Sequence, residues 1–129
     1  MLQRGILNPQ ILGLLGRVRH TNTLVIADRG FPFWPRMETA DISLVDDVPT
    51  VLQVLMALQD GFTIGKAFMA EEFLAENDEP TRAAYRELLA PAEIQFEPHV
   101  EFKKRVPQAV GLIRTADTTQ YGNIILESA

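Results

Sequence analysis

Apolar residues along this chain recur in two patterns, one typical of helices and the other typical of strands. From residue 8 to residue 20, isoleucine, leucine and valine recur at the spacing of one helix face. Asn8 is expected to cap that helix, and Pro9 suits its first position because proline has no N–H that needs a partner. Residues 21–28, TNTLVIAD, form a short β-branched run that is continuously apolar at its centre. The pattern predicts a buried strand after the helix, covered on both faces as in parallel sheets.

The rest of the chain continues this alternation between helical and extended patterns. Residues 29–45 hold too many glycines and prolines for a helix, so they are predicted to form a loop that runs into a short extended piece. Asp46 or Asp47 is expected to cap the next helix, and Asp78 the helix after it. The remaining predicted elements are helices over 46–61, 77–92 and 99–108, and strands over 62–70, 93–98, 109–117 and 123–128.

This order of elements predicts an α/β fold, a single domain over residues 1–129 with a mainly parallel central sheet flanked by helices. A length of 129 residues suits one domain, and no repeat, linker or low-complexity tract divides the chain. With 47% hydrophobic and 22% charged residues, the composition is that of a soluble globular protein whose core needs no metal or disulfide.

Charge and cysteine content argue against several classes of protein. The formal net charge is −5 and the only basic run, Lys103–Arg105, is short, which is not expected of a nucleic-acid-binding protein. No apolar stretch approaches the roughly 20 residues of a membrane span. The chain has no cysteine, so it has no disulfide, thiol nucleophile or cysteine-bound zinc. We expect a cytoplasmic protein that acts on a small molecule, without a nucleic-acid or membrane partner.

Two ionisable residues flank the first predicted strand. Asp28 follows it, at the carboxyl end where α/β sheets usually bind ligands, although the same aspartate can instead form a local turn over Asp-Arg-Gly. His20 precedes the strand, where it can act in catalysis or simply bond to a carbonyl at the helix end. If the strand is straight, its two ends lie about 20 Å apart. Either the chain folds back before Thr23, or the site forms where two subunits meet and activity requires an oligomer.

Aromatic residues follow Asp28 in a proline-stiffened loop. Phe31, Phe33 and Trp34 suit a sugar, because the C–H face of a sugar packs on an aromatic ring while its hydroxyls bond to polar groups. The alternative is that these rings seal the domain or a subunit interface.

Two later segments carry further candidate side chains. His99 and Lys103 are four residues apart on one face of a predicted helix. Tyr121, Gly122 and Asn123 offer a phenol, a flexible turn and an amide that both donates and accepts hydrogen bonds. The alternative for these three residues is a simple turn before the last strand.

Other chemistries find no support in the sequence. There is no Gly-x-Ser-x-Gly nucleophile elbow, phosphate-binding Walker loop or dinucleotide glycine pattern. Two histidines and scattered carboxylates do not predict a metal site. The glutamates of AEEFLAEND are expected on a solvated helix or strand end.

Five segments together resemble one known family. HTNTLVIADRGFP, VPTVLQVL, AEEF, HVEFKK and YGNIIL are similar to the D-ribose pyranase family, the ribose and fucose mutarotases, from about Gly5 to Leu126. The resemblance implies that His20 is the acid/base residue. It also implies ring-shaped homo-oligomers with the site between neighbouring subunits, and a reaction that needs no cofactor or metal. The sugar-binding residues that it implies are Asp28, His99, Lys103, Tyr121, Gly122 and Asn123.

Some positions depart from the family pattern. Arg19 stands where the family usually has glycine before the histidine, and GFPFWP is bulkier than the loop of the ribose branch. Tyr-Gly-Asn is more typical of the fucose branch, whereas His99 with Lys103 is more typical of the ribose branch. The implied function is interconversion of the β-pyranose and β-furanose forms of ribose. The alternatives are a mutarotase for fucose or another monosaccharide, and a non-catalytic sugar-binding or transport-accessory protein.

Overall fold

A computed structural model describes all of residues 1–129. In chain order its elements are α1 (Pro9–Leu15), β1 (Thr23–Ala27), β2 (Thr39–Asp41), α2 (Val51–Leu58), β3 (Ile64–Ala70), α3 (Glu72–Glu76), α4 (Glu79–Leu89), β4 (Glu93–Glu97), α5 (His99–Arg105), the 3₁₀-helix η1 (Val106–Gln108), β5 (Gly111–Arg114) and β6 (Ile124–Ser128).

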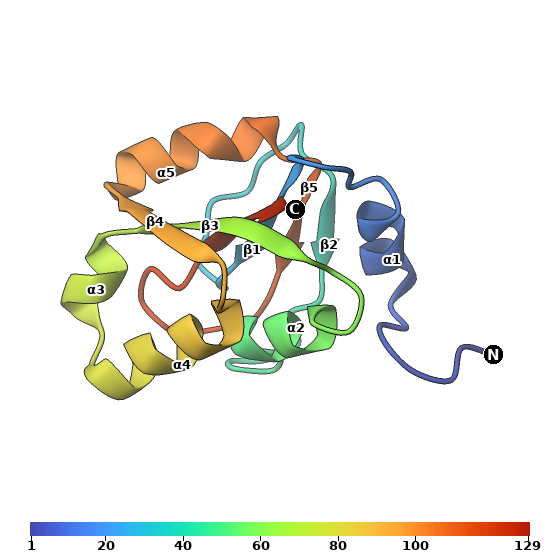
Figure 1. The fold of residues 1–129 in the computed structure, drawn as a ribbon, viewed down its shortest axis with the longest axis horizontal. Coiled ribbons are helices and arrows are strands. Elements are labelled where there is room, and N and C mark those ends of the chain that lie inside the picture. The colour runs from blue at the N-terminus through green and yellow to red at the C-terminus, as the bar shows by residue number, and fades with distance from the viewer.

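The six strands form one sheet in the order β2-β5-β1-β6-β3-β4, which confirms the predicted α/β fold with a mainly parallel sheet (Figure 1). Strand β6 alone runs antiparallel, and it lies between β1 and β3. The other pairs, β1 with β5, β2 with β5 and β3 with β4, are parallel. The carboxyl ends of five strands and the amino end of β6 therefore meet at one edge, which we call the carboxyl edge of the sheet.

Apolar side chains form a separate core on each face of the sheet. Helices α1, α2 and α4 cover one face, where Leu14, Leu55 and Tyr85 are almost fully buried. Helix α5 and the loop after β1 cover the other face, where Phe102 and Phe31 are buried (Figure 1). Because both faces are covered, the central strands are apolar on both sides, as their continuous apolar runs predicted.

Helix α2 begins later than the sequence predicted. Neither Asp46 nor Asp47 caps it; Thr50 does, since its side chain accepts from Gln53 N while the Gln53 side chain accepts from Thr50 N. Asp47 instead lies in a tight turn at φ 63°, and its carboxylate accepts hydrogen bonds from Thr118. The predicted caps Asn8 and Asp78 are confirmed.

Helix α1 is shorter than predicted, whereas α3 is a helix in a segment that was expected to be a helix or a strand end. Helix α1 ends at Leu15 and is followed by Gly16, whose carbonyl accepts from the Arg19 guanidinium, so the helix does not extend to residue 20. The glutamate-rich segment after β3 contains a short helix, α3, whose Phe73 is buried in the core. The tertiary packing of that phenylalanine holds a helix too short to form on its own.

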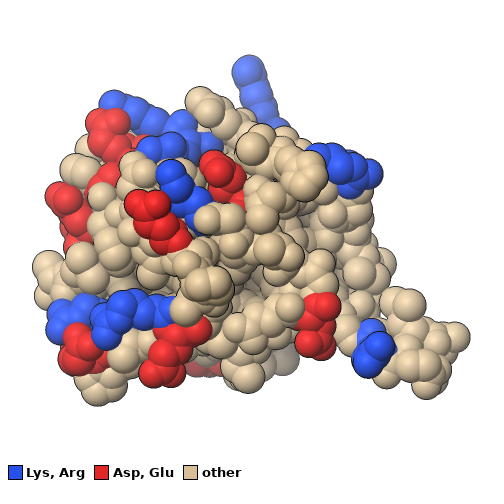
Figure 2. All heavy atoms as spheres, viewed as in Figure 1, with Lys and Arg blue, Asp and Glu red and all other residues tan.

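Charged side chains of both signs lie next to one another on the surface in Figure 2. On α4, for example, Glu79 forms ion pairs with Arg82 and Arg86. Such exposed pairs contribute little to stability. No helix in the structure has the length and apolar character needed to cross a lipid bilayer.

Two adjacent residues of α2 provide a test of this packing. Leu55 is 1% exposed and Met56 is 59% exposed. We expect L55A to lower the free energy of unfolding by about 2–5 kcal/mol, because it leaves a cavity in the core. M56A is the matched control on the same helix and should change it by less than about 0.5 kcal/mol. Urea denaturation measures both; equal losses would contradict the placement of this helix.

Candidate functional site

Asp28 and Asn123 form a reciprocal pair at the carboxyl edge of the sheet. Asp28 follows β1 and Asn123 precedes β6, and these strands are neighbours. The Asp28 N–H donates to Asn123 Oδ1 at 2.7 Å, and Asn123 Nδ2 donates to Asp28 Oδ2 at 3.1 Å. Gly30 N donates to Asp28 Oδ1 at 2.9 Å, so the local turn foreseen at Asp28 also exists. A carboxylate has about four acceptor positions, so Asp28 keeps capacity for a ligand hydroxyl.

A second carboxylate, that of Asp117, holds the loop that leads to Asn123. Asp117 is 3% exposed, and its carboxylate accepts from Val51 N at 2.8 Å and from Thr119 N at 2.7 Å. It therefore joins the start of α2 to the loop before β6. Burial raises the pKa of Asp28, and the charge of Asp117 raises it further, while the hydrogen bonds from Gly30 and Asn123 oppose the shift.

His99 is the first residue of α5, and its ring is held by neighbours on several elements. The His99 N–H donates to the Glu72 carboxylate at 3.0 Å, which ties the start of α5 to α3. The ring stacks on Phe102 with centroids 6.0 Å apart and meets Tyr121 edge-on at 5.1 Å. Its buried Nε2 has no hydrogen-bond partner within the chain. Buried polar atoms normally have one, so Nε2 is available to a ligand or a water molecule.

Charge and burial together keep the His99 ring neutral. Burial lowers the pKa of His99 below its usual 6.5, and the nearby ammonium of Lys103 lowers it further. Glu72 and Asp28 act in the opposite direction without reversing the shift. At neutral pH the ring therefore carries one N–H and one acceptor nitrogen, which suits hydrogen bonding to a hydroxyl.

Six of the seven residues proposed from the sequence gather at this edge. Tyr121 lies against His99, and Gly122 joins Tyr121 to the Asn123 of the reciprocal pair. Lys103 is half-buried one turn along α5, close enough for its charge to act on His99. Asp28 completes the set.

His20 lies at the opposite edge of the sheet. Its side chain is exposed, and its Nδ1 is 2.6 Å from the carbonyl oxygen of Ala129, which follows the last strand. The neighbouring Thr21 N–H donates to Ser128 O at the end of β6. The chain therefore does not fold back before Thr23 to bring His20 to Asp28. Within one chain, His20 remains apart from the other candidates.

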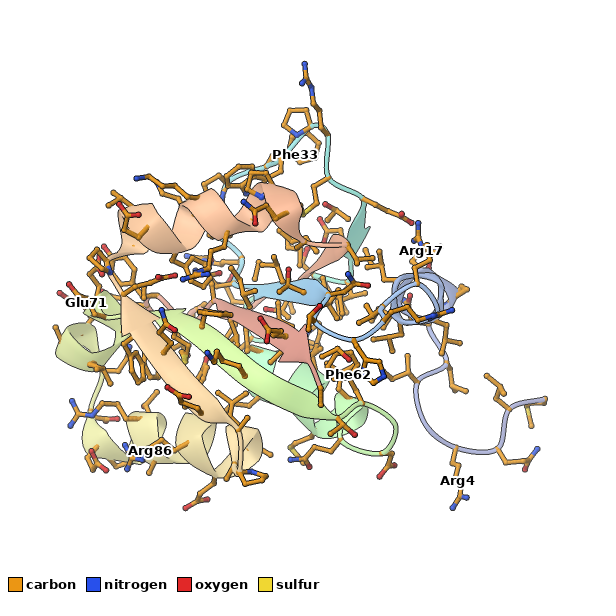
Figure 3. All side chains as sticks on the ribbon, turned by 45° about the horizontal axis from the view of Figure 1, so that its top comes forward. Arg4, Arg17, Phe33, Phe62, Glu71 and Arg86 are labelled. Carbon is orange, nitrogen blue, oxygen red and sulfur yellow. The ribbon has the colours of Figure 1, made fainter.

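The aromatic residues after β1 differ in their burial. Phe31 is 5% exposed and its ring meets Phe102 and His99, so it belongs to the core and supports the site. Phe33 is 75% exposed, and Figure 3 shows it on the outside of the molecule, away from the sheet. Trp34 is half-buried against Phe31.

Sequence reasoning missed the supporting carboxylates. Asp117 ends the strand segment LIRTAD, so the rule that selected Asp28 at a strand end would also have selected it. Glu72 was expected on a solvated surface, yet it is half-buried and accepts the His99 N–H. No sequence signal pairs it with a backbone group 27 residues away.

No three His, Cys, Asp or Glu side chains converge in a way that could hold a metal ion.

The fold and this edge define a class of protein: a small α/β domain that gathers carboxylate, amide, imidazole and phenol groups at the carboxyl edge of its sheet. The chain belongs to the RbsD / FucU transport protein family, whose sequence profile matches residues 1–129.

Named relatives and solved structures resemble the chain over almost its full length. The D-ribose pyranase of Geobacillus kaustophilus is 39% identical, covering 99% of this chain and 93% of the relative. The D-ribose pyranase of Bacillus cereus is 34% identical, covering 99% and 97%. The structure of Bacillus subtilis RbsD complexed with D-ribose aligns with a TM-score of 0.92 at 31% identity, covering 100% of this chain and 98% of that one.

A more distant structure shares the fold. The fucose mutarotase of Streptococcus pneumoniae, in complex with L-fucose, aligns with a TM-score of 0.82 at 16% identity, covering 100% of this chain and 98% of that one. At that identity the likeness extends to the fold alone.

The lowered pKa of His99 predicts how stability changes with pH. The neutral His99 ring contributes its full stabilisation of the fold above the pKa of the unfolded chain, near 6.5. That stabilisation is lost as the pH falls from there through the lower pKa of the folded protein. H99Q cannot gain a proton, so it should lose less unfolding free energy than the parent between about pH 7.5 and about pH 5. Urea denaturation across this range measures the difference.

The exposed neighbour Val100 supplies the control. V100Q places the same amide at a position that is 61% exposed in the parent, and it should follow the pH profile of the parent. A profile of H99Q parallel to that of the parent would show that the His99 ring is not buried as described.

Proposed function

We propose that this chain is a D-ribose pyranase, an isomerase that interconverts the β-pyranose and β-furanose forms of ribose. Relatives with that name share 34–39% identity over nearly the whole chain. A structure that holds D-ribose has the same fold at 31% identity. The observation that carries the proposal is the cluster of Asp28, Asn123, His99 and Tyr121 at the carboxyl edge, where hydrogen-bonding groups fit sugar hydroxyls.

The reaction needs a proton to leave one oxygen and another to reach a second oxygen. A base removes the proton of the anomeric hydroxyl while an acid protonates the ring oxygen, and the ring opens to the aldehyde. Another hydroxyl then attacks the aldehyde carbon, and the protons return, which gives the furanose. Histidine suits this exchange because imidazole side chains titrate near neutral pH. A modest enhancement of about 10²–10⁴-fold is typical of general acid–base catalysis.

Each residue at the edge has a role in holding the sugar. The Asp28 carboxylate accepts from a hydroxyl, and the Asn123 amide holds that carboxylate in place. His99 uses its free Nε2 as a hydrogen-bonding atom, and Tyr121 offers its phenol beside it. Lys103 lies at the same edge, and its charge favours the neutral form of His99.

His20 completes this site from a neighbouring subunit of a ring-shaped homo-oligomer. Two features support this arrangement: His20 lies at the edge opposite Asp28, and its side chain is exposed. A copy that places its own His20 edge against the carboxyl edge of the next would bring an imidazole to the sugar. The furanose product would suit a kinase that phosphorylates that form, and the location that we propose is therefore the cytoplasm, where ATP is available.

Two other functions use the same site. A mutarotase for L-fucose or another monosaccharide would need only different hydroxyl contacts around Tyr121–Asn123, and the fold of a fucose mutarotase is similar. A sugar-binding or transport-accessory protein would bind without turnover.

Saturation-transfer NMR on ribose and fucose separates the three functions. Faster pyranose–furanose exchange of ribose supports the proposal. Exchange between the anomers of fucose alone supports the mutarotase. Line broadening of a sugar without exchange indicates binding only.

Mixed oligomers test the shared site. Alone, H20A and D28N should each lose about 10²–10⁴-fold of the exchange rate, because each lacks one side chain of every site. Co-expressed in equal amounts, they should recover about a quarter of the parent rate, since one interface in four pairs an intact His20 with an intact Asp28.

The matched control replaces D28N in the mixture by the double variant H20A/D28N. No chain then carries His20, and the rate should stay at the level of H20A. If co-assembled H20A and D28N recover nothing, or if a monomer of the parent is fully active, the shared site is wrong.

A further inference from the structure

Gly122 is packed so closely that no larger residue fits its present position. A Cβ atom added there would lie 2.7 Å from the Tyr85 hydroxyl oxygen and 3.2 Å from the Thr119 carbonyl oxygen. Its φ is not positive, so other residues could adopt this backbone conformation. Contact with neighbouring atoms, rather than backbone conformation, is therefore what requires glycine here.

The Tyr85 hydroxyl that meets Gly122 is itself unusual. Tyr85 belongs to α4, is 1% exposed, and packs its ring on Phe73 with centroids 4.7 Å apart. Its oxygen forms no well-aligned hydrogen bond within the chain. Burial raises the pKa of Tyr85, and the charge of Asp117 adds to this while Thr119 opposes it, so the hydroxyl is neutral. A buried hydroxyl without a partner costs stability, and a phenylalanine would fill the core without that cost.

The loop before β6 is held by side chains on either side of this contact. Thr118 bonds to the Asp47 carboxylate, and the Gln120 carbonyl accepts from Asn77 Nδ2 at 2.9 Å. Asn123 bonds to Asp28 beyond it. Between these anchors the Gly122 N–H has one backbone bond, to Thr119 O at 3.2 Å. The hydroxyl of Tyr85 thus supports the stretch of loop that has the fewest hydrogen bonds.

Tyr121 gives this support a consequence for the site. Its φ is 53°, in the left-handed region that side chains other than glycine seldom adopt. Residues stay in that region only when their surroundings hold them there. The same conformation turns the Tyr121 ring edge-on to His99.

We propose that Tyr85 is a positioning residue, whose hydroxyl presses against Gly122 and holds Tyr121 and Asn123 in the geometry that binds the sugar. The effect of Tyr85 on sugar binding rests on the proposed function. The contact between Tyr85 and Gly122 can be tested without it.

A pair of substitutions provides the test. In G122A the new methyl group meets the Tyr85 hydroxyl, and the loop must move; overpacking of this kind should raise the KM for ribose about tenfold. Y85F removes the hydroxyl and leaves the loop less constrained, so KM should rise about threefold with kcat nearly unchanged. In Y85F/G122A the methyl group takes the space of the missing oxygen, and KM should return to the level of Y85F.

NMR spectra give a second measurement that does not depend on sugar turnover. The side-chain amide of Asn123 and the backbone amide of Asp28 should shift in G122A and return toward their parent positions in the double variant. If the parent does not act on ribose, the proposed function fails while these shifts still test the contact.

Two control variants separate positioning from general effects. G13A introduces a methyl group with no neighbour within 4 Å and should match the parent in KM and in these shifts. L58A removes a buried side chain at the end of α2, a helix that carries no candidate site residue, and should lower Tm with little effect on the kcat and KM of the folded protein.

The proposal fails if G122A binds ribose as the parent does with unshifted amides, or if Y85F does not relieve the defect of G122A. Should G122A not fold, Y85F must restore folding. A double variant as damaged as G122A overturns the proposal in either case.

Discussion

The reciprocal hydrogen bonds between Asp28 and Asn123 are the contact on which the candidate site depends. They join the end of β1 to the start of β6, and these ends coincide because β6 runs antiparallel beside β1. In an all-parallel sheet the residue before β6 would lie at the opposite edge. The direction of a single strand therefore places an amide beside the carboxylate at the edge where the other candidate residues lie.

Side chains bonded to backbone groups hold the rest of the edge in place before any ligand arrives. Glu72 accepts the His99 N–H, and Asp117 joins the start of α2 to the loop that leads to Asn123. Groups fixed in this way need little rearrangement on binding, which is the physical basis of preorganisation. Burial also prepares this edge, because it lowers the pKa of His99 and so keeps the ring neutral, with one nitrogen able to accept a hydrogen bond.

The same sheet that assembles this edge holds His20 away from it. A strand carries its two flanking residues to opposite edges, so an imidazole before β1 and a carboxylate after it are kept apart by the length of the strand. A site that uses both must be shared between copies of the chain. Activity would then require assembly of the ring-shaped oligomer, and a chain that does not assemble would be inactive.

The sequence by itself determined the elements and most of the candidate residues. Apolar spacing located the helices and strands, and the strand-end rule together with the family resemblance selected Asp28, His99 and Asn123, which the fold brings to one edge. These features are local, since they depend on residue types within a few positions of one another. The cap of α2 was misplaced because several polar residues precede that helix and only the folded backbone selects Thr50.

Only the tertiary structure decided the contacts between distant segments. Glu72 meets the start of α5, Asp117 accepts the Val51 N–H of α2, and Tyr85 fills the space beside Gly122. Each of these contacts joins residues far apart in the chain, and each sets a carboxylate or hydroxyl against a backbone group. A backbone group has the same chemistry at every position, so no pattern of residue types marks it in advance. The fold decides which one lies within reach.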